Sequence, residues 1–438
     1  MKKVREITVI GAGLAGCEAA WQAAERGLSV KLVDMKPGRM SPAHRYSGFS
    51  ELVCSNSLGS DSIENGKGLL KQELRQLGSL IIECADTVRI PAGDALAVDR
   101  QAFSDIVTKR IVNHKNISVE HRHVDKLPSD SPVVVATGPL TTPELSDAIE
   151  AVLGQGRLYF YDAASPIIEA DSIDCRRSFR ASRYNKGDAD YINCPLDEKQ
   201  YDIFVNGLVG AERADVREFE EIVHFEGCMP IESMAARGRD VMRFGPLKPK
   251  GLWDPATGKE PYAVVQLRQD NTQGTLYNIV GFQTRLTQGE QKRVFGLIPA
   301  LAEAKYARFG MMHRNTYINS PRLLDARFSL RTGNHFYFAG QITGVEGYVE
   351  SIASGLTAGM SLAAELAGEP ATVFPPETMI GALGNYISTY RGKNFQPMNA
   401  NFGIIECGQL PGKMSKREKY QFISENSLNT LKLVYNKR

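Results

Sequence analysis

One short glycine motif constrains the fold of this chain more than any other feature. The motif, residues 11–16, reads G-A-G-L-A-G and follows an apolar segment at 7–10. An alanine-rich segment comes next, and a second apolar segment, 29–33, ends at Asp34. This order of strand, glycine turn, helix, strand and acidic residue is typical of a dinucleotide-binding β-α-β unit. The sequence therefore predicts a Rossmann-like domain at its start.

Each part of the motif has a physical role in holding a dinucleotide. Gly11 permits a tight turn, Gly13 lets a pyrophosphate approach the backbone, and Gly16 lets the helix pack on the strand. The helix N-terminus offers unpaired N–H groups and a positive dipole end to the phosphates. Asp34 is expected to accept hydrogen bonds from ribose hydroxyls. The first predicted cofactor-binding residues are Gly11, Ala12, Gly13, Leu14, Ala15, Gly16 and Asp34.

Two later segments favour FAD over NAD as the dinucleotide. Residues 133–138 are an apolar run that ends in Ala-Thr-Gly, a turn found in many flavoprotein nucleotide domains. Residues 336–341 predict another strand, followed by glycines and a helix with an apolar residue at every fourth position. In two-part flavin domains such a segment meets the flavin ring and ribityl chain. Its predicted cofactor-binding residues are Gly340, Gln341, Gly344, Gly347, Tyr348 and Ser351.

A nucleotide domain completed from both ends of the chain implies that the middle is an insertion. We predict an α/β fold, a FAD-binding Rossmann-like domain of the glutathione-reductase type with an inserted α+β domain. The predicted parts are 1–175 for the start of the FAD-binding domain, 176–304 for the insertion, and 305–438 for the rest of the FAD-binding domain with a basic C-terminal tail.

Local patterns predict three further structures. Apolar residues over 69–81 recur at the spacing of one amphipathic helix, and Asp99 has the position of an N-cap for the next helix. Residues 262–267 and 275–281 are expected to pair as a hairpin within the insertion.

Composition excludes several classes of protein. Of the 438 residues, 42% are hydrophobic and 23% are charged, as in ordinary globular chains, and the net charge of +2 excludes a histone-like binder. The apolar runs are too short to span a membrane. The seven cysteines are scattered and form no C-x-x-C, so we predict neither a disulfide framework nor a metal site. We expect a cytoplasmic protein.

Basic residues gather in three places. Residues 176–186 hold five Lys or Arg and no acid, 237–250 hold five against one Asp, and the tail from 412 holds seven against two Glu. Aromatic residues interleave with the first two clusters. RNA binding uses this combination, because phosphates supply affinity and unpaired bases stack. On composition alone, a solvated basic surface is an equal alternative.

Two cysteines are candidates for chemistry. Cys54 lies in a polar loop ahead of a helix, and Cys228 lies between a glycine and a methionine followed by proline. Most free cysteines are buried and inert, but a loop near basic groups favours the nucleophilic thiolate. The residues themselves do not say which reaction such a thiolate would serve.

Several long segments resemble the TrmFO family, the folate- and FAD-dependent tRNA (uracil-5-)-methyltransferases. They follow the family order over nearly the whole chain, and one difference is Gly59, where we expect an arginine. The segments that carry the resemblance are 11–16, 51–57, 225–232, 261–268, 312–316 and 340–355.

The resemblance implies a reaction and its residues. The one-carbon unit of 5,10-methylenetetrahydrofolate reaches C5 of uridine 54, in the T-arm of tRNA, through reduced FAD, and NADPH or NADH then reduces the flavin again. By its motif Cys228 adds to C6 of the uracil, because C5 is a weak nucleophile until a thiolate adds. Cys54 accepts the C5 proton or protects the first thiol. His313 and Arg314 are assigned to the substrates, with His313 beside the folate.

Four other functions remain open from the sequence. A GidA-like enzyme of the tRNA wobble uridine and an rRNA methyltransferase share the chemistry. The other two alternatives, a small-molecule flavin oxidoreductase and a non-catalytic flavin-binding RNA protein, do not involve methylation of RNA. The segments around Cys54 and Cys228 favour TrmFO over the GidA-like function.

Overall fold

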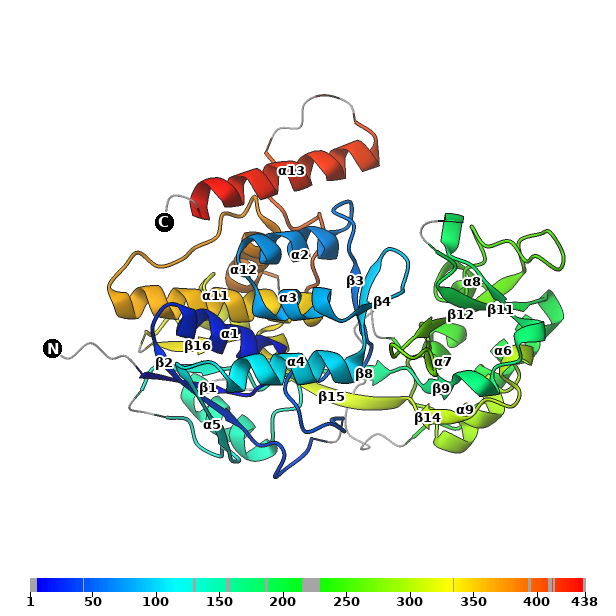
Figure 1. The fold of residues 1–438 in the computed structure, drawn as a ribbon, viewed down its shortest axis with the longest axis horizontal. Coiled ribbons are helices and arrows are strands. Elements are labelled where there is room, and N and C mark those ends of the chain that lie inside the picture. Colours follow the sequence, from blue (N-terminus) through cyan, green and yellow to red (C-terminus); the bar gives the residue numbers. More distant parts are fainter. Residues whose placement is uncertain are drawn as a thin grey trace.

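A parallel sheet, on the left in Figure 1, combines strands from the first part of the chain with β16 from its last third. The computed structural model describes residues 6–41, 43–128, 131–154, 158–185, 188–214, 229–333, 335–392, 395–408, 412 and 414–435. The five strands pair in parallel in the order β16-β7-β1-β2-β6. They are β1 (Glu6–Ile10), β2 (Ser29–Asp34), β6 (Ile117–His121), β7 (Val133–Val135) and β16 (Phe336–Phe338).

Helices cover both faces of this sheet, so its strands are apolar on both sides. Val9 and Leu32 pack toward α1 (Leu14–Glu25) and α11 (Tyr348–Ala367), whereas other sheet residues pack toward α5 (Pro143–Leu153). Helices α1 and α11 can pack closely because Gly355 has no side chain. A Cβ there would overlap the carbonyl oxygen of Ala15. Helix α11 therefore brings the second predicted cofactor segment against the glycine motif.

The middle of the chain forms a second, antiparallel sheet with its own core. Strands β8 (Leu158–Ala164) and β15 (Met311–Tyr317) pair with each other and lead into and out of this part (Figure 1). The sheet order is β10-β11-β12-β13-β9-β14, with β9 (Ile167–Glu169), β10 (Phe179–Arg180), β11 (Tyr191–Leu196), β12 (Ala263–Gln269), β13 (Leu276–Ile279) and β14 (Tyr306–Arg308). Its helices are α6 (Glu198–Val209), α7 (Ile231–Ala236), α8 (Val241–Phe244) and α9 (Gln288–Phe295). We call the part from β9 to β14 the inserted unit.

Two of the three local predictions are confirmed and one is wrong. β12 and β13 pair as the expected hairpin, and Asp99 caps α4 (Arg100–Val112) through its Oδ1. The single helix over 69–81 is instead α2 (Gly66–Gln76) followed by α3 (Leu80–Thr87). Gly78 separates them with φ of 71°, a left-handed conformation that ends a helix, and Ser79 then caps α3.

The remaining elements belong to the part of the chain outside the inserted unit, which we call the first unit. The segment predicted as a basic tail contains α13 (Lys416–Tyr435), which is held on the molecule by Ser424 Oγ, a donor to the carbonyl of Ile63 at 2.6 Å. None of the described helices is long and apolar enough to cross a membrane. The other elements are β3 (Ser57–Ser60), β4 (Arg89–Ile90), β5 (Ala95–Val98), α10 (Ser320–Leu323) and α12 (Met379–Thr389).

Candidate dinucleotide and thiol site

A cavity of about 1130 Å³, including its open mouth, lies between the glycine motif and the start of α11. The structure brings two distant predicted segments together on its wall. The predicted residues that line it are Gly11, Gly13, Leu14, Ala15, Asp34, Cys54, Gly340, Gln341, Tyr348 and Ser351. Those that do not are Ala12, Gly16, Gly344 and Gly347.

The glycine motif has the shape that a pyrophosphate requires. A Cβ at Gly11 would lie 2.5 Å from the carbonyl oxygen of Ala136, and one at Gly16 would overlap the carbonyl of Gly11. These two glycines therefore permit close packing. A Cβ at Gly13 would meet no described atom within 4 Å, and no described side chain caps α1 there. The N-terminus of α1 is thus open toward the cavity, as phosphate binding requires.

Asp34 connects this cavity to a smaller one. Its carboxylate accepts hydrogen bonds from the backbone N–H of Ala12 at 2.6 Å and of Lys36 at 2.8 Å. A carboxylate has about four acceptor positions, so it can also accept from ribose hydroxyls. The position at the end of β2 is the one that the sequence predicts.

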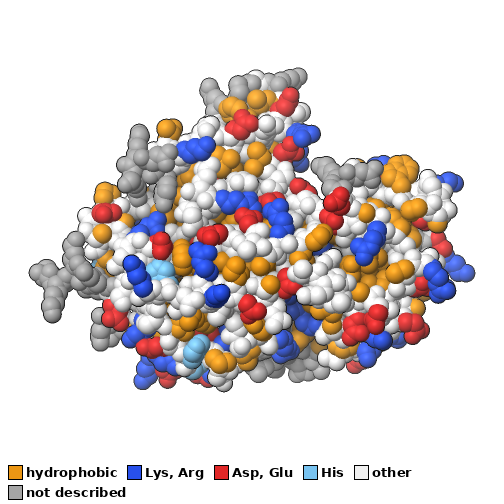
Figure 2. Space-filling view, in the orientation of Figure 1, with side chains coloured by type: hydrophobic (Ala, Val, Ile, Leu, Met, Phe, Trp, Pro, Cys, Tyr) orange, Lys and Arg blue, Asp and Glu red, His pale blue; other side chains and the backbone are white. Residues whose placement is uncertain are grey.

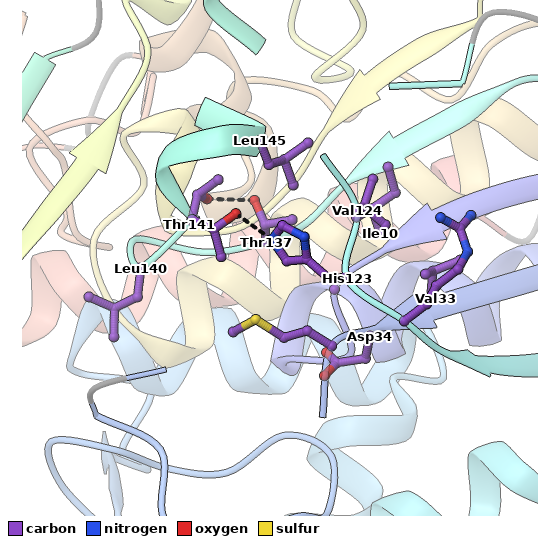
Figure 3. Close-up of a pocket in the computed structure, with 13 residues that line it drawn as sticks. Ile10, Val33, Asp34, His123, Val124, Thr137, Leu140, Thr141 and Leu145 are labelled. Carbon is purple, nitrogen blue, oxygen red and sulfur yellow. Dashed lines mark hydrogen bonds between the residues drawn. The ribbon is translucent and has the colours of Figure 1, made fainter. Parts of the chain in front are cut away.

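The smaller cavity, of about 400 Å³, has an apolar floor and a polar rim (Figure 3). Ile10, Val33 and Leu145 give it apolar walls. At the rim Thr137 and Thr141 hydroxyls lie 2.6 Å apart, and His123 Nε2 lies 3.1 Å from the hydroxyl of Thr142. The sequence predicted Gly11, Asp34 and Thr137 of the Ala-Thr-Gly turn, which all line this cavity. It did not predict the rim residues, which lie in irregular segments without a motif: Arg122, His123, Leu140, Thr141 and Thr142.

Cys54 lies on the wall of the large cavity, directly against Tyr348. Its Sγ is 3.1 Å from the Tyr348 hydroxyl, which also accepts from the N–H groups of Cys54 at 2.8 Å and Ser55 at 3.2 Å. Burial raises the pKa of Tyr348 well above its usual value, and a charge on Cys54 acts in the same direction. The Tyr348 hydroxyl therefore keeps its proton. Because the two N–H groups already donate to its oxygen, the hydroxyl is expected to donate its own proton to the neighbouring sulfur.

Two arginines, Arg100 and the buried Arg268, hold the Cys54 loop from opposite units. Arg100 of α4 donates to the carbonyls of Leu52 and Val53 and to Asp270, with an Nε–Oδ2 distance of 3.0 Å. Arg268 of β12 donates to Asn56 Oδ1 at 3.1 Å and to Ser55 Oγ at 2.7 Å. Burial lowers the pKa of Arg268. Sequence reasoning missed both arginines, because no local pattern connects them to Cys54.

For three predicted site residues the structure describes the backbone alone or nothing. Cys228 lies outside the described residues. His313 and Arg314 belong to β15, where they pair with Asp162 and Tyr161 of β8, and only their backbone is described. The roles of all three residues stay predictions.

Gly59, the noted difference from the family pattern, has a clear conformational requirement. Its φ is 80°, which favours glycine, and a Cβ would lie 3.1 Å from Lys67 Cδ. An arginine would be strained in this backbone.

The basic clusters are less positive in space than along the sequence. Arg239 pairs with Asp202 at 2.7 Å and with Glu198 at 2.9 Å, and Arg176 pairs with Asp174 at 3.1 Å. The acids come from outside each basic run, and Figure 2 shows both signs of charge interspersed over this face. Exposed aromatic side chains remain, at 83% for Phe244 and 61% for Trp253.

The fold and the large cavity define a protein of the GidA type with a two-part dinucleotide-binding domain. A family model described as "Glucose inhibited division protein A" matches residues 6–370. Two crystal forms of Aquifex aeolicus GidA superpose with TM-scores of 0.70 and 0.68 at 16% and 15% identity. The first match covers 99% of this chain and 73% of that chain, the second 97% and 76%. These likenesses confirm the predicted fold class.

Within that class the chain belongs to the TrmFO family. The methylenetetrahydrofolate–tRNA-(uracil-5-)-methyltransferase TrmFO of Acetivibrio thermocellus is 56% identical over 428 residues, which are 98% of this chain and 97% of that protein. The TrmFO of Geotalea daltonii is 55% identical over 97% of each chain. The family resemblance predicted from the sequence is confirmed.

Proposed function

We propose that this protein is a methylenetetrahydrofolate- and FAD-dependent tRNA (uracil-5-)-methyltransferase that forms 5-methyluridine at uridine 54 in the T-loop. The observation that carries the proposal is the position of Cys54 on the wall of the dinucleotide cavity, where a thiol can act on a base bound beside the cofactor. The family membership supports the same reaction.

The cavity walls fit FAD. Gly13 and the N-terminus of α1 would hold the pyrophosphate, Asp34 a ribose, and the smaller cavity the adenine. Gly340, Gln341, Tyr348 and Ser351 would then contact the flavin. The bound flavin supplies the carrier for the one-carbon unit and the hydride, with NADPH or NADH as the source of electrons.

The protein's own part is to activate the uracil. In this proposal the base is flipped out of the T-loop, Cys228 adds to C6, and C5 becomes nucleophilic. Cys54 accepts the C5 proton afterwards, and the Tyr348 hydroxyl donor 3.1 Å away supports the thiolate that this role needs. His313 contacts the folate, and Arg314 contacts a substrate.

RNA is proposed to bind across the inserted unit. Arg176 and Arg177 have side chains that are 90% and 61% exposed, so phosphates can reach them although Asp174 is near. Phe244 and Trp253 offer exposed rings on which unpaired bases can stack.

The test uses purified protein, unmodified tRNA transcript, labelled methylenetetrahydrofolate and NADPH, with the nucleosides analysed by mass spectrometry. Label in 5-methyluridine of the T-loop is expected, as is its loss in Cys228→Ala with FAD binding kept. Label in ribosomal RNA alone would show that the substrate is wrong. Consumption of NADPH without labelled RNA would favour the small-molecule oxidoreductase.

A further inference from the structure

Arg308 is a partly buried cation, and two of its nitrogen atoms are buried without an acceptor among the described residues. It ends β14, at the edge of the second sheet and just before β15. Its Nε and Nη2 atoms are buried, and neither has a hydrogen-bond partner in the part of the chain that the structure describes. A buried charged donor without an acceptor is strongly unfavourable, so a fold that retains one indicates a missing acceptor.

Arg308 lies close to the large cavity, because a Cβ on Gly310, two residues further on, would lie 2.7 Å from the carbonyl oxygen of Ala164, which lines that cavity. The charged or ionisable groups that act on it are Arg100, Asp270, Tyr348 and Cys54. Cys54 and Tyr348 line the large cavity. Asp270 is already bonded to Arg100 at 3.0 Å, and Arg100 itself keeps one unpaired buried atom, Nη2. The cations here outnumber the carboxylates, which favours an anionic ligand.

Arg308 remains protonated under working conditions. Burial lowers the pKa of its guanidinium to about 10, and the charge of Arg100 acts in the same direction. At neutral pH the side chain therefore still carries its charge and all its donors.

We propose that Arg308 is a catalytic residue that donates its unpaired N–H groups to the C4 carbonyl oxygen, O4, of the target uracil. The proposal rests on the proposed function and adds a residue to it. When a thiolate adds to C6, the S–C6 bond forms, the π pair of the C5=C6 bond becomes a C4=C5 double bond, and the π pair of the C4=O4 bond moves onto O4, which becomes an enolate oxygen. Loss of the C5 proton to a base later sends the C–H pair to the same atom. A cation at O4 stabilises both steps.

Two observations favour O4 over an RNA phosphate as the acceptor. First, Arg308 is within electrostatic range of Cys54, which we propose to act at C5, and C5 is bonded to C4. Second, the unpaired atoms of Arg308 are shielded from water, whereas phosphates of a folded RNA stay at the surface. Arg308 is not part of the cavity wall in this structure, so the proposal requires its side chain to turn toward the base when RNA binds.

The experiment compares Arg308→Ala and Arg308→Lys with the wild type. The substrate is a tRNA transcript with tritium at C5 of its uridines, and tritium release, 5-methyluridine, the KM for tRNA and the flavin spectrum are measured. We expect Arg308→Ala to lower kcat about a hundredfold, with the KM and flavin content unchanged. Added methylguanidine restores part of the rate, and Arg308→Lys is intermediate. The matched control is Arg327→Ala, which removes a half-buried arginine bonded to Asp325 at 2.6 Å and should keep the wild-type rate.

The other outcomes decide against the proposal. A wild-type kcat in Arg308→Ala overturns it, as does a raised KM for tRNA with kcat unchanged, which would indicate a phosphate contact. If Arg308→Ala does not fold, Arg308→Lys decides, because an unimpaired lysine variant overturns a role that depends on the guanidinium fork. A wild-type enzyme that neither releases tritium nor methylates RNA overturns the proposed function, and this role with it.

Discussion

The hydroxyl of Tyr348 makes three contacts, and all of them are to the segment that carries Cys54. It accepts from two backbone N–H groups, at 2.8 and 3.2 Å, and lies 3.1 Å from the sulfur. Tyr348→Phe removes the donor to the sulfur and leaves both N–H groups unpaired. We expect iodoacetamide to alkylate Cys54 about tenfold more slowly at neutral pH, the effect of removing one hydrogen bond. Peptide mapping by mass spectrometry measures the rate.

Cys175 supplies the internal control for that measurement. It is exposed and belongs to the inserted unit, so its alkylation should be the same in both proteins. An unchanged rate at Cys54 would mean that the Tyr348 hydroxyl does not support the thiolate.

At the same scale, the sequence could indicate candidate residues that belong to a continuous motif. It could not indicate residues that only the folding of distant segments brings to the candidate site. The glycine motif and Asp34 could be found because turn, helix and strand follow one another in the chain. Arg268 bonds to Ser55 and Asn56, beside Cys54, only because β12 folds against their loop, and no spacing along the chain records that contact.

Among the elements, the crossing of α1 and α11 determines whether the cavity forms. A Cβ at Gly355 would overlap the backbone of Ala15, which cannot yield as a flexible side chain would. We expect Gly355→Ala to cost about 3 kcal/mol of unfolding free energy and to weaken FAD binding, since α1 must shift. Gly289→Ala in α9 is the control, because its Cβ meets no described atom within 4 Å and should be neutral or slightly stabilising. Urea unfolding of both variants tests this.

Glu73 of α2 joins three helices through one buried carboxylate. It accepts from the N–H groups of Met379 at 2.7 Å and Ile380 at 2.8 Å, at the start of α12, and from the Ser427 hydroxyl of α13. Burial raises its pKa from 4.5 to about 7. The folded state therefore binds the proton more tightly than the unfolded state, so this stabilisation is complete below the unfolded pKa and is lost as the pH rises through about 7.

The free energy of unfolding is expected to fall by about 3 kcal/mol between a pH below the unfolded pKa of Glu73 and a pH above its folded pKa. Urea midpoints of the wild type should fall as the pH rises from about 5 to about 8, and Glu73→Gln should show a flatter profile over that range. Parallel profiles for the two proteins would mean that another group carries the dependence.

Element boundaries show the same limit on prediction. The apolar spacing over 69–81 is continuous, but the positive φ of Gly78 divides it into two helices. Periodicity detects which residues face the core, and it does not detect where the backbone turns while the apolar face continues.

For the whole molecule, the order of segments along the chain predicts an insertion, whereas no pattern predicts the contacts at the junction of the two units. Asn56 Nδ2 donates to Val98 of the first unit and to Gln269 of the inserted unit, at 3.1 and 3.0 Å. The Cys54 loop is therefore bonded to both units. Long-range contacts of this kind leave no periodic signal in the sequence.

RNA binding is the property that belongs to the whole surface. Each phosphate that a basic side chain neutralises releases counterions, so removing one such side chain changes the slope of log K against log salt by about 0.7 to 0.9. The double variant Arg176→Ala with Arg177→Ala removes two exposed cations of the inserted unit, and we expect weaker tRNA binding and a slope smaller by about 1 to 2. The double variant Lys109→Ala with Lys115→Ala removes the same charge from exposed positions of the first unit and should keep the wild-type slope. If both double variants show the same salt slope, tRNA binding depends only on the net charge of the protein. A specific binding surface on the inserted unit requires that only the Arg176 and Arg177 variant changes the slope.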